Sequence, residues 1–199
     1  MSKKTSIAKL LEKKKLILAS SSPRRAEILT RKKVTFEIKI PGSYNEEHIF
    51  SDPVTHVLEV SRRKAQSVAD QVGDGIILGA DTIVVLDGEI LGKPKNEDEA
   101  LLFLKKLGGR MHQVYTGITL INKPTGKVIS DYDLTKVKFN QLDEQKILSY
   151  ISTGEPMDKA GAYGIQGMGN FLVDHIEGSL DNVIGLPTEK LREMLKQIA

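Results

Sequence analysis

The chain contains no cysteine. A disulfide scaffold, a cysteine-ligated zinc site and thiol redox chemistry are therefore excluded. Long hydrophobic runs are also missing, and none approaches the roughly 20 residues that a membrane-spanning helix needs. Aromatic residues make up only 5% of the chain, and the formal net charge is only +3. Nucleic-acid-binding proteins usually gather positive charge and aromatic side chains on one face, so the composition argues against that class.

The first fifteen residues are basic and partly amphipathic. They lack the apolar centre of a secretory signal, and their scarcity of arginine argues against a mitochondrial presequence. We expect residues 1–15 to be a solvated extension or a short helix, and the protein to be cytoplasmic. The length of 199 residues and the 40% hydrophobic content suit a globular protein. We therefore expect residues 16–199 to form a single domain.

Strand-like and helix-like segments alternate along the chain, which predicts an α/β fold. Apolar and alternating patterns predict strands at 16–19, 34–40, 76–78, 82–86, 112–121 and 127–139. Asp87-Gly88 is a hairpin signal, and the last two strands are expected to be antiparallel neighbours. Capping residues and apolar stripes predict helices at 26–31, 51–72, 96–107, 142–153 and 188–198, the second of them capped by Ser51.

A serine- and arginine-rich segment, residues 20–25, follows the first predicted strand and opens a helix that Ser22 can cap. A helix N-terminus offers unpaired N–H groups and a partial positive charge to an anion. The hydroxyls of Ser20 and Ser22 and the guanidinium groups of Arg24 and Arg25 add to this. The segment is a candidate phosphate site. The alternative is a plain helix start with two solvated arginines.

Asp81 lies within an apolar strand, after the small residues Gly79 and Ala80. A carboxylate in such a strand is costly unless it meets a metal, a cation or several donors. Asp81 is therefore a candidate metal ligand or general base. The alternative is a buried aspartate that backbone amides satisfy.

Two lysines and a glycine-rich segment are further candidates. Lys64 borders the buried stripe of its helix, where it can extend to solvent or reach a phosphate. Lys93 follows the hairpin, whose return strand can bring it towards the Asp81 end; the alternative is a surface-turn lysine. In the segment 158–167, Gln166 can contact a base edge or a metal. The alternative there is an irregular loop with a packed Tyr163. None of the four histidines is assigned a catalytic role.

Six stretches, from about Leu16 to the C-terminus, together resemble the Maf family of nucleoside-triphosphate pyrophosphatases. They are ASSSPRR (19–25), KA (64–65), GADTIV (79–84), GKP (92–94), GEPMDKAGAYGIQG (154–167) and NVIGLP (182–187). The resemblance implies a long mixed β-sheet flanked by helices, a cleft between two lobes, and a homodimer. It also implies hydrolysis of a nucleoside triphosphate to its monophosphate and pyrophosphate. Residues 159–167 resemble the subgroup that acts on dTTP and UTP.

The resemblance also implies roles for individual residues. Asp81 would accept the proton of the attacking water. The triphosphate would be held by Ser20, Arg24, Arg25, Lys64 and Lys93, and base choice would depend on Arg24, Thr82 and Gln166. The family's acidic residue is Glu46 or Glu47, and counting from Pro41 favours Glu46. Leu180 stands where family members often have an aromatic residue.

These roles lead to a hypothesis for the cofactor and the partners. A Mg²⁺ ion, with Mn²⁺ as the alternative, would bridge Asp81, Glu46 and phosphate oxygens. The expected partner is the nucleoside triphosphate, with no nucleic acid and no membrane. The competing hypothesis is a nucleotide-binding regulator of septum formation, a process to which the family is linked, which would use the same cleft without turnover.

Overall fold

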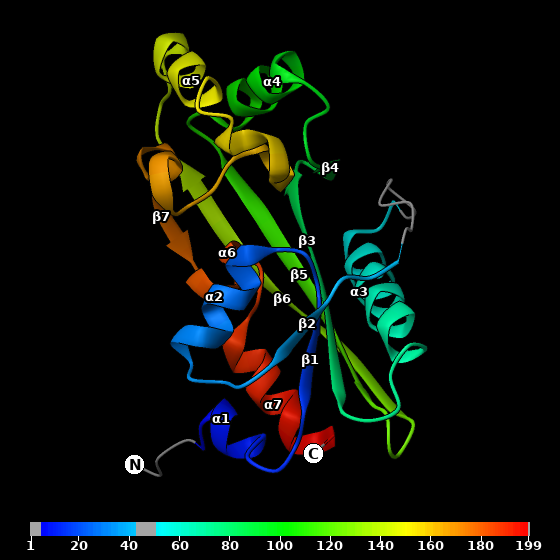
Figure 1. Cartoon of the computed structure of the whole chain (residues 1–199). Helices are drawn as coiled ribbons and strands as arrows, with labels where there is room; N and C mark the ends of the chain where they lie inside the picture. The colour runs from blue at the N-terminus through cyan, green and yellow to red at the C-terminus, as the bar shows by residue number, and fades with distance from the viewer. Residues whose placement is uncertain (1–4, 43–50, 199) are drawn as a thin grey trace. The chain divides into compact units, whose positions relative to one another are not determined.

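The computed structural model describes residues 5–42 and 51–198. Within them a seven-stranded mixed sheet has the order β2-β1-β3-β5-β6-β7, with β4 paired to β3 (Figure 1). The strands are β1 (Leu16–Ala19), β2 (Glu37–Lys39), β3 (Ile76–Leu86), β4 (Glu89–Leu91), β5 (Met111–Asn122), β6 (Lys127–Phe139) and β7 (Val173–Glu177). The predicted α/β fold, a long mixed sheet flanked by helices, is confirmed.

The helices and helical turns account for most of the remaining chain. The α-helices are α1 (Ile7–Leu10), α2 (Pro23–Arg31), α3 (Pro53–Ala69), α4 (Glu97–Leu107), α5 (Glu144–Ile151), α6 (Leu180–Ile184) and α7 (Thr188–Ile198). Three 3₁₀ turns follow α5, namely η1 (Glu155–Asp158), η2 (Ala160–Ala162) and η3 (Gly167–Leu172). In the described part of the chain, every helix falls short of the length and hydropathy that a membrane span requires.

The chain divides into two compact units. Unit 1 comprises Met1–Asp81, Thr116–Asp133 and Gly185–Ala199, and unit 2 comprises Thr82–Tyr115 and Leu134–Ile184. The strands β3, β5 and β6 each contribute residues to both units. The cleft between lobes and the homodimer stay predictions.

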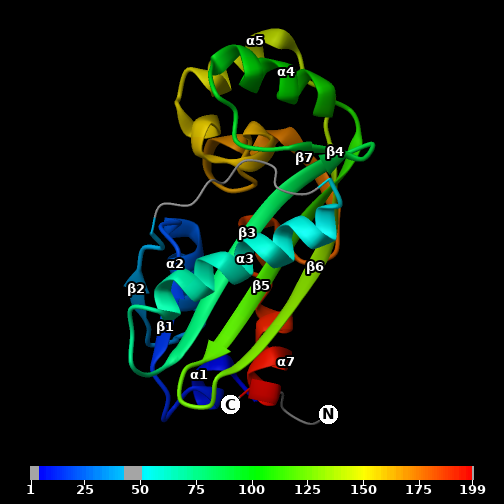
Figure 2. The ribbon, with the colours of Figure 1, turned by 90° about the vertical axis from the view of Figure 1, so that its right-hand side faces the viewer.

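In unit 1, helices lie on both faces of the sheet. Helix α3 crosses one face, and α2 and α7 lie on the other (Figure 2). On the α3 face, Ile17 and Ala19 of β1 pack with Ala65 and Val68 of α3. In the predicted extension, α1 packs against α7, and Ile7 is buried. Burial of these apolar side chains is what holds the layers together.

Two glycines allow α3 to lie unusually close to the sheet. A Cβ atom on Gly79 would lie 2.2 Å from the carbonyl oxygen of Ser61, and one on Gly117 would lie 2.3 Å from that of Val57. Real Cβ atoms do not approach that closely, so a side chain at either position would push the helix away. Gly79, two residues before Asp81, therefore allows the short distance between α3 and β3.

Unit 2 has its own hydrophobic core. Helices α4 and α5 lie side by side (Figure 1), and the turn η2 packs against α4. Buried side chains from β4, α4, β6 and α5 meet there, among them Leu91, Leu104, Phe139 and Tyr150. This core supports the long irregular segment between α5 and β7.

Several predicted boundaries differ from those of the structure. The strand predicted at 34–40 is limited to 37–39. Asp52, not Ser51, caps α3, because Asp52 Oδ2 accepts hydrogen bonds from both Thr55 N at 2.8 Å and Thr55 Oγ1 at 2.7 Å. The strand segments predicted at 76–78 and 82–86 form one continuous strand, β3, which also includes residues 79–81.

Candidate active site

The parallel pairing of β1 with β3 brings the serine-rich turn, at the end of β1, close to Asp81, in the middle of β3. Ala19 pairs with Gly79 in this register. Ser20 follows the first of these residues directly, and Asp81 lies two residues beyond the second. Because paired strands lie only about 4.8 Å apart, the turn and the aspartate lie close together in unit 1.

Asp81 is buried and paired with a cation from α3. Its side chain leaves β3 on the same face as Gly79, because residues two apart share a face of a strand. Lys64 Nζ donates to Asp81 Oδ1 at 2.7 Å. Asp81 is 9% exposed and Lys64 is 6% exposed. Lys64 pairs with the carboxylate, as the cost of burying a charge requires, so the alternative in which Lys64 extends to solvent is wrong.

His56 also faces this carboxylate, although the sequence alone did not predict a role for it. Its Nε2 lies 3.7 Å from Asp81 Oδ2, and the residue is buried. His56 and Lys64 are eight residues apart on α3, which puts them on the same side of the helix. That spacing is the signal in the sequence that points to His56.

The turn after β1 is tied together by Ser20 and Arg25. Ser20 Oγ accepts from Ser22 N at 3.1 Å and from Arg25 Nη1 at 3.0 Å. Arg25 Nε donates to the carbonyl oxygen of Gly185 at 2.9 Å. Arg25 is 8% exposed and Arg24 is half-buried, so the alternative of two solvated arginines is wrong. The Ser20 hydroxyl, with two bonds accepted, still has its own proton to donate.

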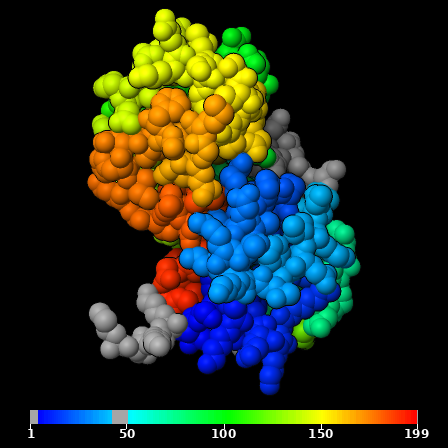
Figure 3. All heavy atoms as spheres, turned by 60° about the vertical axis from the view of Figure 1, so that its left-hand side comes forward, coloured from blue at the N-terminus to red at the C-terminus, as the bar shows by residue number. Residues whose placement is uncertain are grey.

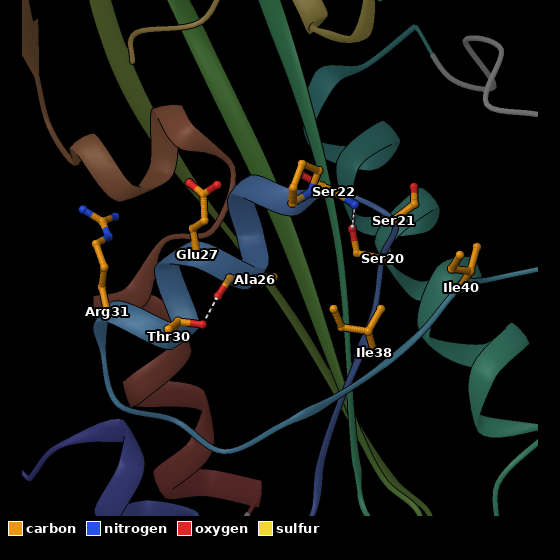
Figure 4. Close-up of a pocket in the computed structure, with 10 residues that line it drawn as sticks. Ser20, Ser21, Ser22, Ala26, Glu27, Thr30, Arg31, Ile38 and Ile40 are labelled. Atoms are coloured by element: carbon orange, nitrogen blue, oxygen red, sulfur yellow. Dashed lines mark hydrogen bonds between the residues drawn. The ribbon is translucent and has the colours of Figure 1, made fainter. Parts of the chain in front are cut away.

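Ser22 occupies the N-cap position of α2, but its side chain makes no capping hydrogen bond, contrary to prediction. The Ser20 hydroxyl shapes the turn instead, through the backbone N–H of Ser22 (Figure 4). The backbone N–H groups in the first turn of α2 therefore do not donate to the Ser22 hydroxyl. The same turn forms part of a pocket of about 710 Å³ between α2 and β2, which Ile38 and Ile40 also line (Figure 4).

Unit 2 brings together a second group of predicted residues. Val84 pairs with Leu91, so the chain at Lys93 has returned along β3 towards Thr82. Gly161 N donates to the carbonyl oxygen of Gly92 at 2.9 Å, which joins the Lys93 turn to the glycine-rich segment. A Cβ on Gly161 would lie 2.9 Å from Val84, so the segment lies directly on β3. Lys93 and Gln166 are exposed, and Thr82 is half-buried.

Tyr163, in the same segment, is packed in the interior of unit 2. Its hydroxyl lies 2.8 Å from His112 Nε2, and Phe139 meets both rings edge-on. Burial lowers the pKa of His112 to about 3, so the imidazole is neutral near pH 7 and can accept from the tyrosine. The alternative of a loop with a packed Tyr163 is therefore correct for the buried part of the segment. Gln166 lies on its exposed part.

The predicted metal ligands are described only in part. Glu46 and Glu47 lie outside the described residues, and within 5–42 and 51–198 no three His, Asp or Glu side chains form a metal-binding group. Magnesium often takes only one or two carboxylates and completes its shell with water and phosphate oxygens. The buried carboxylate of Asp81 fits such an ion as one ligand.

The fold and the site define an α/β protein that holds a buried carboxylate beside the serine- and arginine-rich start of a helix. A family model described as Maf-like protein matches residues 15–198. The chain is 47% identical to the dTTP/UTP pyrophosphatase of Thermoanaerobacter sp. (strain X514), over 92% of this chain and 96% of the relative. It is 51% identical to the dTTP/UTP pyrophosphatase of Thermococcus kodakarensis, over 90% and 96% respectively. The chain belongs to the Maf family.

Proposed function

We propose that this protein hydrolyses dTTP and UTP to the monophosphate and pyrophosphate. Two relatives that carry the name dTTP/UTP pyrophosphatase are 47% and 51% identical to it, and the match covers 96% of each. The structural observation that carries the proposal is the buried Lys64–Asp81 pair, one strand away from the serine-rich turn. A carboxylate fixed beside an anion-binding turn is what attack of water on a phosphate requires.

Asp81 takes the proton of the attacking water. Lys64 holds Oδ1 at 2.7 Å and so fixes the orientation of the carboxylate. The 3.7 Å between His56 Nε2 and Oδ2 exceeds hydrogen-bond length, which leaves Oδ2 able to accept from a water molecule. A base held in one orientation acts without the cost of reorganising it at the moment of reaction.

In this proposal the triphosphate binds to cationic and N–H-rich groups of the chain. Ser20 and Ser22 offer hydroxyls beside the start of α2, and Arg24 and Lys93 offer positive charge that offsets the charge on the departing pyrophosphate. Arg25 contributes chiefly by holding the turn, because its Nε and Nη1 already donate within the chain. Arg24, Thr82 and Gln166 contact the base.

The divalent ion completes the site in this proposal. Asp81 and Glu46 would hold Mg²⁺, with Mn²⁺ as the alternative. When bound, the ion neutralises negative charge on the phosphate oxygens and polarises the bond that breaks. The enzyme acts as a homodimer in the cytoplasm.

A pyrophosphate-release screen tests the proposal. Purified protein is supplied with Mg²⁺ and each natural nucleoside triphosphate, together with modified pyrimidine nucleotides. The expected result is preferential release from dTTP and UTP, with loss of release in EDTA and recovery on adding Mg²⁺. Tight binding of dTTP without any release would contradict the proposal and favour the regulator of septum formation.

A further inference from the structure

The loop that carries Gln166 is held on both sides by one pair of side chains, Tyr150 and Glu155. The Tyr150 hydroxyl donates to Glu155 Oε1 at 3.0 Å and accepts from Gly164 N at 3.0 Å. The other carboxylate oxygen, Glu155 Oε2, accepts from Met168 N at 3.0 Å. These two backbone amides lie two residues before and two residues after Gln166. The pair therefore fixes the backbone symmetrically about that glutamine.

Glycines let the backbone wrap closely around this pair. A Cβ on Gly164 would lie 3.2 Å from Glu155 Oε1, and one on Gly167 would lie 3.1 Å from Glu155 Oε2. A Cβ on Gly169 would lie 2.8 Å from the Tyr150 hydroxyl. The loop is thus shaped around one carboxylate and one phenol, which leaves its backbone few other positions.

The two hydrogen bonds that the Glu155 carboxylate accepts are of the stronger kind. A hydrogen bond to a carboxylate is charge-assisted and roughly twice as strong as a neutral one. Burial raises the pKa of Tyr150, which keeps its hydroxyl protonated and able to donate. Lys159 Nζ donates to the backbone carbonyl of Glu155 at 2.6 Å and fixes the carboxylate's own backbone.

Gln166 itself is exposed. The part of unit 2 that contains it, coloured yellow to orange, lies at the surface in Figure 3. An exposed glutamine has several rotatable bonds, and ordering it on a ligand costs side-chain entropy. The place that its amide can reach therefore depends on how firmly the backbone beneath it is held. Glu155 and Tyr150 supply that hold.

We propose that Glu155 is a positioning residue for base selection: it fixes the loop through Tyr150 and Met168 N and so places Gln166 against the base. The inference rests on the proposed function, in which Gln166 contacts the base. Asp81 and Lys64 lie outside this network, so loss of the Glu155 carboxylate acts on binding and on choice between bases, and spares turnover.

The test compares Glu155→Gln with the matched control Glu144→Gln. The first substitution keeps the volume but leaves one acceptor oxygen for two donors, whereas the second removes an exposed carboxylate paired with Lys105. For Glu155→Gln, KM for dTTP rises about 10-fold, kcat changes less than about 3-fold, and the preference for dTTP over dCTP in kcat/KM falls about 10-fold. The control leaves all three unchanged. Unchanged selectivity in Glu155→Gln would overturn the inference.

A double variant tests whether Glu155 acts through Gln166. The selectivity of Glu155→Gln/Gln166→Ala should equal that of Gln166→Ala alone, because a loop that no longer presents a glutamine has nothing left to position. Losses that multiply in the double variant would refute this route. Tyr150→Phe, which keeps the ring and removes the hydroxyl, should reproduce the selectivity loss of Glu155→Gln.

Hydrogen exchange separates this inference from the proposed function. Peptides covering residues 160–170 should exchange faster in Glu155→Gln than in the wild type and the Glu144→Gln control, whether or not nucleotide is hydrolysed. Equal exchange in all three proteins would overturn the positioning role even in an active enzyme. If the wild type releases no pyrophosphate but Glu155→Gln still exchanges faster than the wild type, the proposed function is refuted. The role of Glu155 in fixing the loop is then retained.

Discussion

The two units hold their candidate site residues in contrasting ways. In unit 1, Asp81, Lys64, Ser20 and Arg25 are each at most 9% exposed, and they lie on regular strands and helices or directly beside them. In unit 2, Lys93 and Gln166 are exposed, and the glutamine lies between two 3₁₀ turns. The proposed proton acceptor is thus built into packed layers, whereas Gln166, one of the three proposed base contacts, depends on an anchored surface loop. Positions on packed layers tolerate little displacement, while a loop can change without disturbing them.

The largest effect on kcat should come from neutralising Asp81, the buried carboxylate of unit 1. Asp81→Asn keeps the shape of the side chain but removes the proton acceptor and the partner of Lys64, so kcat should fall by at least about 100-fold. Asp98→Asn, on the exposed first turn of α4, serves as the control. Steady-state pyrophosphate release measures the effect. Wild-type turnover in a folded Asp81→Asn protein would remove Asp81 from the mechanism.

A glycine-to-alanine substitution should destabilise the protein more in the packed layers of unit 1 than in the surface loop of unit 2. Gly79→Ala would place a Cβ 2.2 Å from the backbone oxygen of Ser61, so the free energy of unfolding should fall by about 3 kcal/mol. Gly164→Ala meets first the flexible end of Lys159, at 2.8 Å, and should cost less than about 1 kcal/mol. Urea denaturation measures both. Equal losses would show that α3 can move away from β3 at little cost.

Unit 2 contains a buried group that should make stability depend on pH. The pKa of His112 is about 3 in the folded protein, below its ordinary value of 6.5. The stabilisation is therefore fully present above pH 6.5 and is lost progressively as the pH falls towards 3. At pH 4.5 the loss should be about 2 kcal/mol relative to pH 7. His112→Gln should lack this component of the loss in urea denaturation at the two pH values. An identical loss in the variant would mean that His112 is not held neutral.

A smaller effect is expected from the exposed lysine of unit 2. Lys93→Met should reduce kcat/KM for dTTP about 10-fold, because a solvated charge contributes less than a buried one. Lys95→Met, two residues along the same exposed turn, should change it less than about 2-fold. Steady-state kinetics at low and high salt compares them. A loss for Lys93→Met equal to that for Lys95→Met would exclude a specific phosphate contact.

Much of the fold could be predicted because local signals agree with the final packing. Leu16–Ala19, the Asp87-Gly88 hairpin turn and the Asn96-capped helix each carry a pattern that the structure realises. The cap of α3 was predicted one residue early, because Ser51 and Asp52 are both suitable cap residues. Only the position of Thr55 N decides between them.

The contacts of the site were harder to predict, because they depend on distances between elements. Gly79 can be read from the sequence, but its role depends on the backbone carbonyl of Ser61, which packs directly against it in the fold. The same close approach brings His56 to Asp81. Because this contact depends on the distance between α3 and β3, the histidine has no evident partner in the sequence. The Tyr150–Glu155 network could not be predicted for a similar reason. The amides of Gly164 and Met168 are separated from Glu155 by the 3₁₀ turns η1 and η2.

The division of the chain has a consequence for the order in which the protein is made. Unit 2 is nested within unit 1, whose last segment begins at Gly185. Arg25, which braces the turn after β1, donates to the carbonyl oxygen of that same residue. During synthesis from the N-terminus, unit 2 has all its residues before unit 1 does. A nascent chain that stops before Gly185 contains every candidate site residue, yet lacks the backbone oxygen against which Arg25 is braced.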